Sequence, residues 1–569
     1  MSIREEIQKA IAEAVSELGL KPEEILIDHP SDFTMGDLTT NVAMMKAKAL
    51  GANPRELAEK IKSALEGKIA DVEKIDVAGP GFINFHLSKD FFNKKIEEVL
   101  SDPQFGANEM LKGRKVMLEY TDPNPFKQFH IGHLMSNAIG ESLSRLYEWS
   151  GAEVKRANYE GDTGLHVAKA IWGIRKKMSE KPVDDAPLSE QVAFLGNAYT
   201  FGSNSYEDDA AAKAEIDELN RVIFLKADPE LNALWEWGKK VSLDHFEEIY
   251  AKLGTKFDYY FFEDKVANRG LEIVNEGLAK GIFEKSDGAV VFRGENHGLH
   301  TRVFINSKGL PTYEAKELAL AEKKNETYSF DESISITASE QNDYFRVVLK
   351  ALELINPELR AKIRHISHGM LRFASGKMSS RKGNVITGES LIAAMQEMVY
   401  DKMKDRPMAN DEKNEISEEV GVAAIKYSIL KQAPGRDIIY DFDKSLSFDG
   451  DSGPYLQYAT VRARSVLDKA RQEGIAASVE RPDDEVAEVA KLVSRFPDVV
   501  LRAERELMPS YLVTYLIELA ANFNSYYADH KIVDAKDAHS PYRVALTSAF
   551  TRVMENGLYL LGMKVPVKM

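Results

Sequence analysis

Apolar and polar positions divide the chain into three parts with different periodicities. In the first part, helical spacing runs from Ile3 to Leu18, and Asn53 opens a second helix. Residues 75–87 read as strand, turn and strand, with alternate apolar residues along the second strand. The pattern predicts a small α+β domain over residues 1–108.

Strands alternate with helices in the second part of the chain. The apolar run Val116–Tyr120 predicts a buried strand, helical spacing follows from Leu134 to Tyr147, and Glu153–Asn158 predicts the next strand. Such alternation is typical of a parallel sheet, which binds ligands at the carboxyl ends of its strands. We therefore predict an α/β domain over residues 109–395.

Two features complicate this α/β domain. Residues from about 178 to 256 are polar and mostly helical, with predicted loops at 178–187 and 204–209, and form an insertion or a covering helical layer. The strand pattern then returns at residues 257–262, 289–292, 303–305 and 333–337.

The third part is helical in its spacing. Beyond Ile386, apolar residues recur at helical intervals to the end of the chain, apart from a polar linker at 474–484. We predict a helical connecting region over residues 396–452 and a helical bundle over residues 453–569.

Composition narrows the class of protein. Of the 569 residues, 44% are hydrophobic and 29% are charged, and no apolar run approaches the roughly 18 residues of a membrane span. The charged N-terminus is unlike a signal peptide, and the lack of cysteine excludes disulfides and thiolate zinc sites. We expect a cytoplasmic protein that does not associate with membranes.

The net charge of −16 counts against a broad nucleic-acid-binding surface. A large acidic protein can nevertheless carry a local basic track. Any complex with a nucleic acid would then depend on a few placed Lys and Arg residues and would weaken as salt increases.

One turn carries unusual chemistry. His130, Gly132 and His133 lie where the strand at 116–120 gives way to a helix. Unpaired backbone N–H groups at a helix start bind anions, and Gly132, which lacks a Cβ, lets a ligand approach the backbone. The alternative is that the two histidines cap the helix or are exposed by chance, and for an isolated His-x-x-His that alternative is favoured.

A second charged segment lies far downstream, at Gly376–Asn384. Lys377, Arg381 and Lys382 share it with the hydroxyls of Ser379 and Ser380. Such a loop could hold a triphosphate, although an ordinary basic surface loop fits the residues equally well. It matches neither the Walker pattern nor G-x-G-x-x-G.

Together the two segments resemble the paired signatures of class I aminoacyl-tRNA synthetases. Residues 130–133 are the complete HIGH sequence, and residues 377–381 are similar to KMSKS, with Ser380 in place of the second lysine. Further stretches resemble arginyl-tRNA synthetases, so that the resemblance covers nearly the whole chain: Ala78–Phe85, Asp122–Lys127, Thr312–Glu317, Met378–Gly383, Gly453–Ala459 and Leu560–Met569.

This resemblance implies a fold class and a reaction. The fold would be multidomain, with a Rossmann-like α/β class I catalytic core, a small α+β N-terminal tRNA-binding domain and an all-α C-terminal anticodon-binding bundle. The enzyme would condense arginine and ATP to arginyl-adenylate and transfer arginine to the 3′ end of tRNA(Arg), activating arginine only with tRNA bound. Mg²⁺ would accompany ATP as its counter-ion, no dedicated metal site is expected, and a monomer is the default.

Roles for individual residues follow from the same resemblance. Glu263, Tyr313 and Glu317 would read the arginine guanidinium, which offers five donors in a plane. Asn124 and Gln341 would hold the α-amino and carboxylate groups. The phosphates would be contacted by His130, His133, Lys127, Lys377, Arg381 and Lys382, and the ATP site completed by Gly132, Met378, Ser379 and Ser380. The anticodon candidates are Tyr455, Tyr458, Arg462 and Arg464, although the i, i+4 spacing of Tyr458 and Arg462 fits ordinary helix packing equally well.

Four residues depart from the family pattern. Glu317 replaces the usual Asp, Tyr344 the usual His, Thr163 the usual Trp of Gly-Asp-Trp-Gly, and Ser380 the second lysine of KMSKS. The first change retains the acid and lengthens its reach by one methylene. The resemblance implies that Lys127 would supply the charge that Ser380 lacks.

Three rival hypotheses remain at this point: a class I synthetase for another amino acid, a small nucleotidyltransferase that shares the histidine turn, and a tRNA-binding protein without catalysis. The nucleotidyltransferase has no need of the helical C-terminal half. The intact His130, His133 and Lys377 count against the silent protein.

Overall fold

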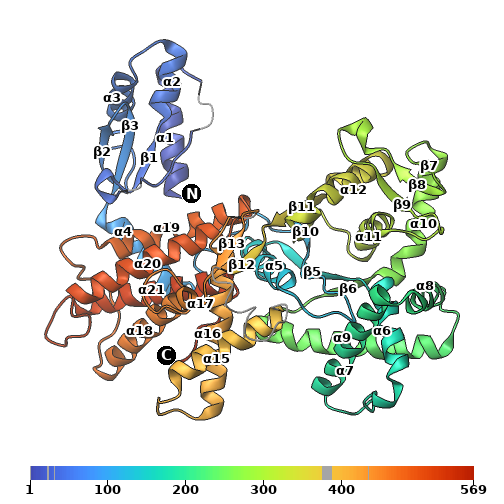
Figure 1. The fold of residues 1–569 in the computed structure, drawn as a ribbon. Coiled ribbons are helices and arrows are strands. Elements are labelled where there is room, and N and C mark those ends of the chain that lie inside the picture. Colours follow the sequence, from blue (N-terminus) through green and yellow to red (C-terminus); the bar gives the residue numbers. More distant parts are fainter. Residues whose placement is uncertain (1, 22–24, 31, 374–386, 434) are drawn as a thin grey trace. The chain divides into compact units, whose positions relative to one another are not determined.

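The structure, a computed structural model, describes residues 2–21, 25–30, 32–373, 387–433 and 435–569 (Figure 1). The chain folds into two compact units. Unit 1 comprises residues 1–105, 462–498 and 518–556, and unit 2 comprises residues 106–461, 499–517 and 557–569. The second basic segment, with Lys377, Met378, Ser379, Ser380, Arg381 and Lys382, lies outside the described residues.

The N-terminal part of unit 1 is an α+β fold around a three-stranded antiparallel sheet of order β1-β3-β2. The predicted strand–turn–strand is confirmed, with Ala78 opposite Phe82 across a turn in which Gly79 and Gly81 take positive φ angles. The elements are α1 (Ile3–Glu17), β1 (Leu38–Thr40), α2 (Val42–Leu50), α3 (Pro54–Leu65), β2 (Val72–Ala78), β3 (Phe82–Leu87) and α4 (Lys89–Ser101).

Local capping explains why two of these helices could be predicted. Ser2 and Glu5 form a capping box at the start of α1, and the Asn53 side chain accepts from the backbone N–H groups of Arg55 and Glu56 at the start of α3. The sequence pattern missed β1, α2 and α4.

Unit 2 is built on a five-stranded parallel sheet of order β11-β10-β4-β5-β6, as the alternating pattern predicts. Helix α5 (Ile131–Trp149) follows β4 and packs against the sheet, while α10, α11 and α12 share a hydrophobic core with it. The strands are β4 (Lys115–Glu119), β5 (Glu153–Glu160), β6 (Tyr259–Phe262), β10 (Glu332–Ala338) and β11 (Ile363–His368). The helices between the later strands are α10 (Glu263–Ala279), α11 (Tyr313–Thr327), α12 (Asn342–Ile355) and α13 (Pro357–Ala361).

A helical insertion separates β5 from β6. It consists of α6 (Leu165–Lys176), α7 (Leu188–Asp208), α8 (Ala210–Phe224) and α9 (Pro229–Leu253), which enclose their own core. The predicted loop at 204–209 is wrong, because α7 continues to Asp208. A Cβ on Gly202 would lie 2.0 Å from the Lys169 carbonyl oxygen, so close packing of α7 on α6 overrides the turn-forming residues of this stretch.

The structure differs from the prediction at three features. The strands at 289–292 and 303–305 do not join the parallel sheet but form a separate antiparallel sheet: β7 (Glu284–Ser286), β8 (Ala289–Phe292) and β9 (Arg302–Ile305). The part beyond Ile386 is not entirely helical, since β13 (Ile438–Tyr440) pairs with β12 (Leu371–Phe373).

The remaining C-terminal elements are helices, as predicted. They are α15 (Gly388–Met403), α16 (Asn410–Leu430), α17 (Phe442–Ser445), α18 (Gly453–Gln472), α19 (Glu488–Arg505), α20 (Ser510–Asp529) and α21 (Ser540–Leu560). The boundary between the two units passes through each of the last four. Among the described helices, none combines the length and apolar character that crossing a membrane requires.

Helix α5 is tied at its far end to three other segments of unit 2. The Arg145 guanidinium donates to Glu141 at 2.7 Å, to the Gly254 carbonyl at 3.0 Å and to the Tyr559 carbonyl at 2.7 Å. Beside it, the buried ammonium of Lys426 donates to the Leu253 and Gly562 carbonyls at 2.6 and 2.7 Å. The end of α9, helix α16 and the C-terminal segment thus meet at one cluster.

Candidate active site

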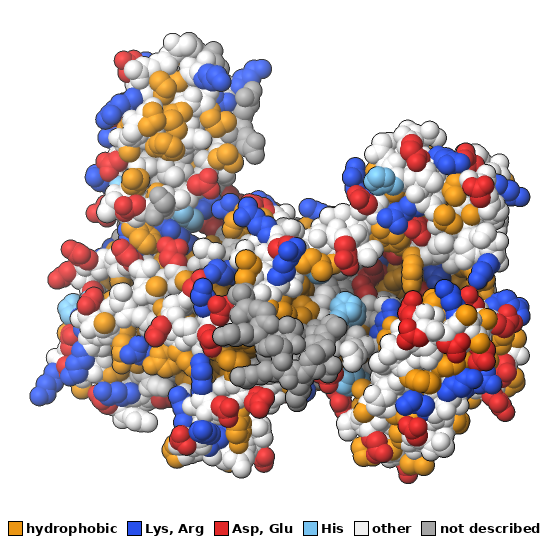
Figure 2. Space-filling view, in the orientation of Figure 1, with side chains coloured by type: hydrophobic (Ala, Val, Ile, Leu, Met, Phe, Trp, Pro, Cys, Tyr) orange, Lys and Arg blue, Asp and Glu red, His pale blue; other side chains and the backbone are white. Residues whose placement is uncertain are grey.

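A cavity of about 270 Å³ opens at the carboxyl ends of the parallel strands, where α/β folds bind their ligands. In Figure 2 this region is a hollow with histidine and acidic side chains, between the lobe of β7–β9 and the lobe of α6–α9. Eight of the residues singled out from the sequence line it together: Asn124, His130, Gly132, His133, Glu263, Tyr313, Glu317 and Gln341.

The segment that leads from β4 to the histidine turn is strained. Thr121, Asp122 and Phe126 have φ angles of 80°, 49° and 70°, which cost about 1–3 kcal/mol each for residues other than glycine. Hydrogen bonds hold the segment: Thr121 N–H donates to Ser136 Oγ at 3.1 Å, and Phe126 N–H to Ser242 Oγ at 2.9 Å. Backbone strain maintained in this way is typical of a functional site.

His130 and His133 bind the backbone of their own helix start. His130 Nδ1 accepts from Gly132 N–H at 3.1 Å, and His133 Nδ1 accepts from His130 N–H at 3.2 Å. The two rings stack with centroids 3.5 Å apart. Because each Nδ1 is an acceptor, each neutral imidazole carries its proton on Nε2, which remains as a donor for a ligand.

Both histidines are neutral at physiological pH. Burial is the main cause that lowers the pKa of His130, and the Lys127 charge adds to it. Burial, His130 and Lys127 lower the pKa of His133 further. The turn therefore offers two N–H donors without two positive charges. The histidines also cap the helix, as the alternative interpretation of the sequence proposed, but they do so through Nδ1 and leave Nε2 for a ligand.

The His130 ring also restricts position 132 to glycine. A Cβ there would lie 2.9 Å from His130 Cε1, so any larger residue would push the His130 ring off its cap. Thr387 pairs with His130, and Gly388 N–H donates to the Phe129 carbonyl at 2.9 Å. The residues that follow the second basic segment along the chain are thus fastened to the histidine turn.

Acidic side chains form a second part of the cavity lining, here called the acidic wall. Glu119, Asp122, Glu263 and Glu317 all line it, and two buried lysines from α11 pair with two of them. Lys324 Nζ lies 2.9 Å from Glu119 Oε2, and Lys316 Nζ lies 2.6 Å from Glu263 Oε2. Four acids facing two lysines leave this wall short of positive charge.

Glu317 and Asp122, which pair with no lysine in the part of the chain that the structure describes, hold protons more tightly than usual. Burial raises the pKa of Glu317 to about 8, and the neighbouring Glu119 charge adds to the effect. Burial and Glu119 also raise the pKa of Asp122 well above its usual range, although Tyr159 N–H donates to Asp122 at 2.8 Å. A cationic ligand would supply the missing charge.

Tyr313 and Tyr344 frame Glu317. Tyr313 and Glu317 lie one turn apart on α11, as their spacing predicts, and Tyr313 is 57% exposed. The Tyr344 hydroxyl donates to the Tyr313 carbonyl at 3.1 Å and approaches Glu317 at 3.5 Å. Tyr344, where the family often has His, therefore contacts both the acid and the backbone at Tyr313.

Sequence reasoning missed several residues of this cavity. Glu119 ends β4, His368 ends β11, and Glu340 lies in the turn after β10, so the rule that parallel strands present ligands at their carboxyl ends could have found them. Lys127 is not among the residues that line the cavity. It lies nearby, and burial lowers its pKa while Glu263 opposes the shift.

The four anticodon candidates lie along α18, and two of them contact other side chains of unit 1. Arg462 stacks over the Tyr527 ring at 4.6 Å, and Arg464 bonds to Glu555 at 2.8 Å. Tyr458 is 38% exposed and packs edge-on against Phe448. The arginines thus contribute to helix packing.

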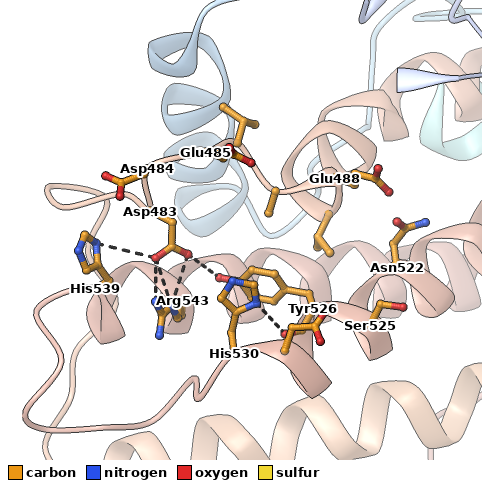
Figure 3. A pocket seen from close by; sticks show the side chains of 14 residues that line it. Asp483, Asp484, Glu485, Glu488, Asn522, Ser525, Tyr526, His530, His539 and Arg543 are labelled. Carbon is orange, nitrogen blue, oxygen red and sulfur yellow. Dashed lines mark hydrogen bonds and ion pairs between the residues drawn. The ribbon is translucent and has the colours of Figure 1, made fainter. Parts of the chain in front are cut away.

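A larger cavity, of about 610 Å³, lies within unit 1 and has a different chemistry (Figure 3). Asp483 accepts from Arg543 at 3.1 Å and from the Tyr526 hydroxyl at 3.0 Å, which ties the polar linker to α20 and α21. The other acids around it are Asp484, Glu485, Glu488 and Asp529. A wall this acidic repels phosphate, so this cavity is not the nucleotide site.

Comparisons with known proteins agree across the chain. Residues 95–442 match the family of tRNA synthetases class I (R), catalytic domain, residues 456–569 the DALR anticodon binding domain, and residues 1–87 the arginyl tRNA synthetase N terminal domain. An arginine–tRNA ligase of Clostridium perfringens is 32% identical over 99% of this chain and 100% of its own, and one of Fusobacterium nucleatum is 32% identical over 99% and 98%.

Solved structures show the same fold. The arginyl-tRNA synthetase of Thermus thermophilus superposes with a TM-score of 0.81 over the whole of both chains at 24% identity, and that of Plasmodium falciparum with 0.79 over 99% of each at 20%. The predicted multidomain class I fold is confirmed. With the histidine turn, the acidic wall and full-length relatives in agreement, the chain belongs to the arginyl-tRNA synthetases, a family of class I aminoacyl-tRNA synthetases.

Proposed function

We propose that this arginine–tRNA ligase carries out both steps of its reaction at the cavity between the histidine turn and the acidic wall. The observation that supports this most is the juxtaposition itself. One cavity is lined by two neutral imidazole donors beside a helix N-terminus and by Glu317 and Asp122, which pair with no lysine among the described residues. The first side suits phosphate and the second suits a guanidinium.

In the first step, the arginine carboxylate attacks the α-phosphorus of ATP and pyrophosphate leaves. No protein nucleophile is needed, because positioning and charge stabilisation suffice. The Nε2–H groups of His130 and His133 would donate to phosphate oxygens as negative charge grows, with Lys127 nearby. Lys377, Arg381 and Lys382 would hold the departing pyrophosphate, and Met378, Ser379 and Ser380 would complete the ATP site together with Gly132.

Arginine would lie with its guanidinium toward Glu263, Tyr313 and Glu317, and with its α-amino and carboxylate groups on Asn124 and Gln341. In the second step, the 2′-hydroxyl at the tRNA 3′ end attacks the adenylate carbonyl, and AMP leaves. ATP would arrive with Mg²⁺ on its phosphates. Within the described ranges no three His, Asp or Glu side chains are grouped closely enough to hold a metal ion.

The domain roles follow the family. Residues 109–395 would catalyse, residues 1–108 would contact the tRNA, residues 453–569 would read the anticodon through α18 and its neighbours, and residues 396–452 would connect the last two functions. Tyr455, Tyr458, Arg462 and Arg464, which all lie on α18, are the candidates for stacking on bases. The lack of cysteine supports a cytoplasmic enzyme, and we propose a monomer.

The direct test is aminoacylation of total tRNA with each amino acid in turn, together with ATP–pyrophosphate exchange with and without tRNA. Arginine alone should be attached, and exchange should require both arginine and tRNA. Attachment of another amino acid would overturn the substrate assignment. If the protein bound tRNA but attached no amino acid to it, it would be a tRNA-binding protein without catalytic activity.

The pH dependence of arginine use gives an independent check on the acidic wall. A raised pKa means that Glu317 is mostly protonated at pH 7, and its charge appears only as pH rises through about 8. The guanidinium needs the charged form, so KM for arginine should fall about 25-fold between pH 6.5 and 8.5 while KM for ATP stays level. The groups that set this behaviour are Glu119, Lys324, Tyr344 and Glu263. A KM for arginine that is constant over this range would mean that Glu317 is already charged at pH 7.

A further inference from the structure

The Glu263 carboxylate is bound asymmetrically. Its Oε2 accepts from Lys316 Nζ at 2.6 Å and from Thr163 Oγ1 at 3.1 Å, and Lys316 Nζ also lies 3.3 Å from Thr163 Oγ1. The three side chains come from α10, α11 and the loop that precedes α6, and none is more than 7% exposed. Both donors therefore bind the same oxygen.

The other oxygen, Oε1, faces the cavity. A Cβ built on Gly161 would lie 3.2 Å from Glu263 Oε1 and 2.2 Å from Asn124 Oδ1, so the two acceptors converge above this glycine. Gly161, Asn124 and Glu263 all line the cavity, whereas Lys316 and Thr163 are not among its lining residues. The ammonium thus lies behind the carboxylate and leaves the front open to a ligand.

We propose that Lys316 is a positioning residue for the arginine substrate, and that Thr163 assists it. By holding Oε2, Lys316 keeps the Glu263 carboxylate turned so that Oε1 meets the guanidinium. This inference rests on the proposed role of Glu263 in binding arginine. It assigns a purpose to two residues whose side chains need not touch the substrate.

A purely structural role explains the pair less well. Burying an ion pair gains little stability over apolar residues of the same volume, so stability alone does not account for a lysine here. Without the ammonium, the buried carboxylate would be free to turn toward another donor, and the guanidinium would lose its partner. The hydroxyl of Thr163, where the family usually has Trp, adds a second donor to the oxygen that the ammonium binds.

The opposite role makes the opposite prediction. If Lys316 merely occupied the guanidinium site until arginine displaced it, its removal would strengthen arginine binding. The direction of the change in KM therefore separates a positioning residue from a competing cation.

The experiment compares Lys316→Met, Lys316→Arg and Thr163→Val in aminoacylation assays on the full chain. Lys316→Met should raise KM for arginine about 30-fold or more, while kcat and KM for ATP stay within about threefold of wild type. Lys316→Arg, which retains the charge, should recover most of the loss. Thr163→Val, which removes one hydroxyl at constant shape, should raise KM for arginine about three- to tenfold.

A double-mutant cycle provides the second readout. Lys316→Met should add little to the effect of Glu263→Gln, because both changes remove the same interaction. Lys323→Met, an exposed lysine on the same helix, is the matched control and should behave as wild type. If Lys316→Met does not fold, Thr163→Val and its cycle with Glu263→Gln still test the inference.

The failures can be told apart. If wild-type protein does not attach arginine, the proposed function is wrong. If it does, but Lys316→Met leaves KM for arginine unchanged or lower, or adds its full effect to Glu263→Gln, then Lys316 does not position Glu263.

Discussion

Replacing His130 by alanine is expected to lower kcat of aminoacylation by about 100- to 1,000-fold, the cost of losing one preorganised donor to transition-state charge. The His130 imidazole has two functions, since Nδ1 caps α5 by accepting from Gly132 N–H and Nε2–H faces outward as a donor. Alanine removes both, whereas asparagine, a good N-cap residue, retains the first. His130→Asn should therefore unfold within about 1 °C of wild type and still lose the same activity.

The measurement is arginine- and tRNA-dependent ATP–pyrophosphate exchange, with thermal unfolding monitored in parallel. His300, an exposed histidine between β8 and β9, gives the matched control, and His300→Ala should exchange normally. If His130→Asn kept activity within threefold of wild type, the imidazole would only cap the helix and the turn would not be the catalytic centre.

Replacing Glu317 by glutamine should raise KM for arginine about 100-fold or more, equivalent to about 3 kcal/mol of lost binding. The substitution leaves the shape nearly unchanged, but it removes the charge and replaces one of the two acceptor oxygens by a donor, which a desolvated guanidinium cannot use. The pH dependence of KM for arginine should disappear in the same variant, because the titrating group is gone.

Steady-state aminoacylation over a range of arginine concentrations measures this effect, with KM for ATP as an internal reference. Glu326, exposed near the end of the same helix and paired only with Lys323 among the described residues, supplies the control Glu326→Gln. If Glu317→Gln had a normal KM for arginine, the arginine side chain would be recognised by Glu263 and Tyr313 without Glu317.

Local structure in this molecule can be predicted from the sequence, whereas contacts between residues far apart in the chain mostly cannot. The strand predicted at 116–120, which lies at 115–119, and the helix after His133 follow from periodicity and are confirmed. Tyr313 and Glu317 are identified by resemblance, and their four-residue spacing places them one turn apart because this segment is helical. The small strands β12 and β13 were not predicted, because two three-residue segments 67 positions apart have no periodicity of their own and exist only through their pairing.

The candidate site divides in the same way. Its two signatures are short and recognisable, and eight predicted residues meet in one cavity. The pairing of Lys316 with Glu263 joins positions 53 apart, and that of Lys324 with Glu119 joins positions 205 apart. No spacing rule predicts such contacts, which are set by the order of the strands and by the way α11 covers the sheet.

The anchoring of α5 has a mechanical consequence. A helix of 19 residues is about 28 Å long and resists bending, so it moves as a rod. Its front end carries both histidines, and its rear end is bonded through Arg145, next to Lys426, to the segment around Tyr559 and Gly562. A displacement of that segment, which falls within the DALR domain match, would reach the histidine turn as a movement of the whole helix rather than as a local rearrangement.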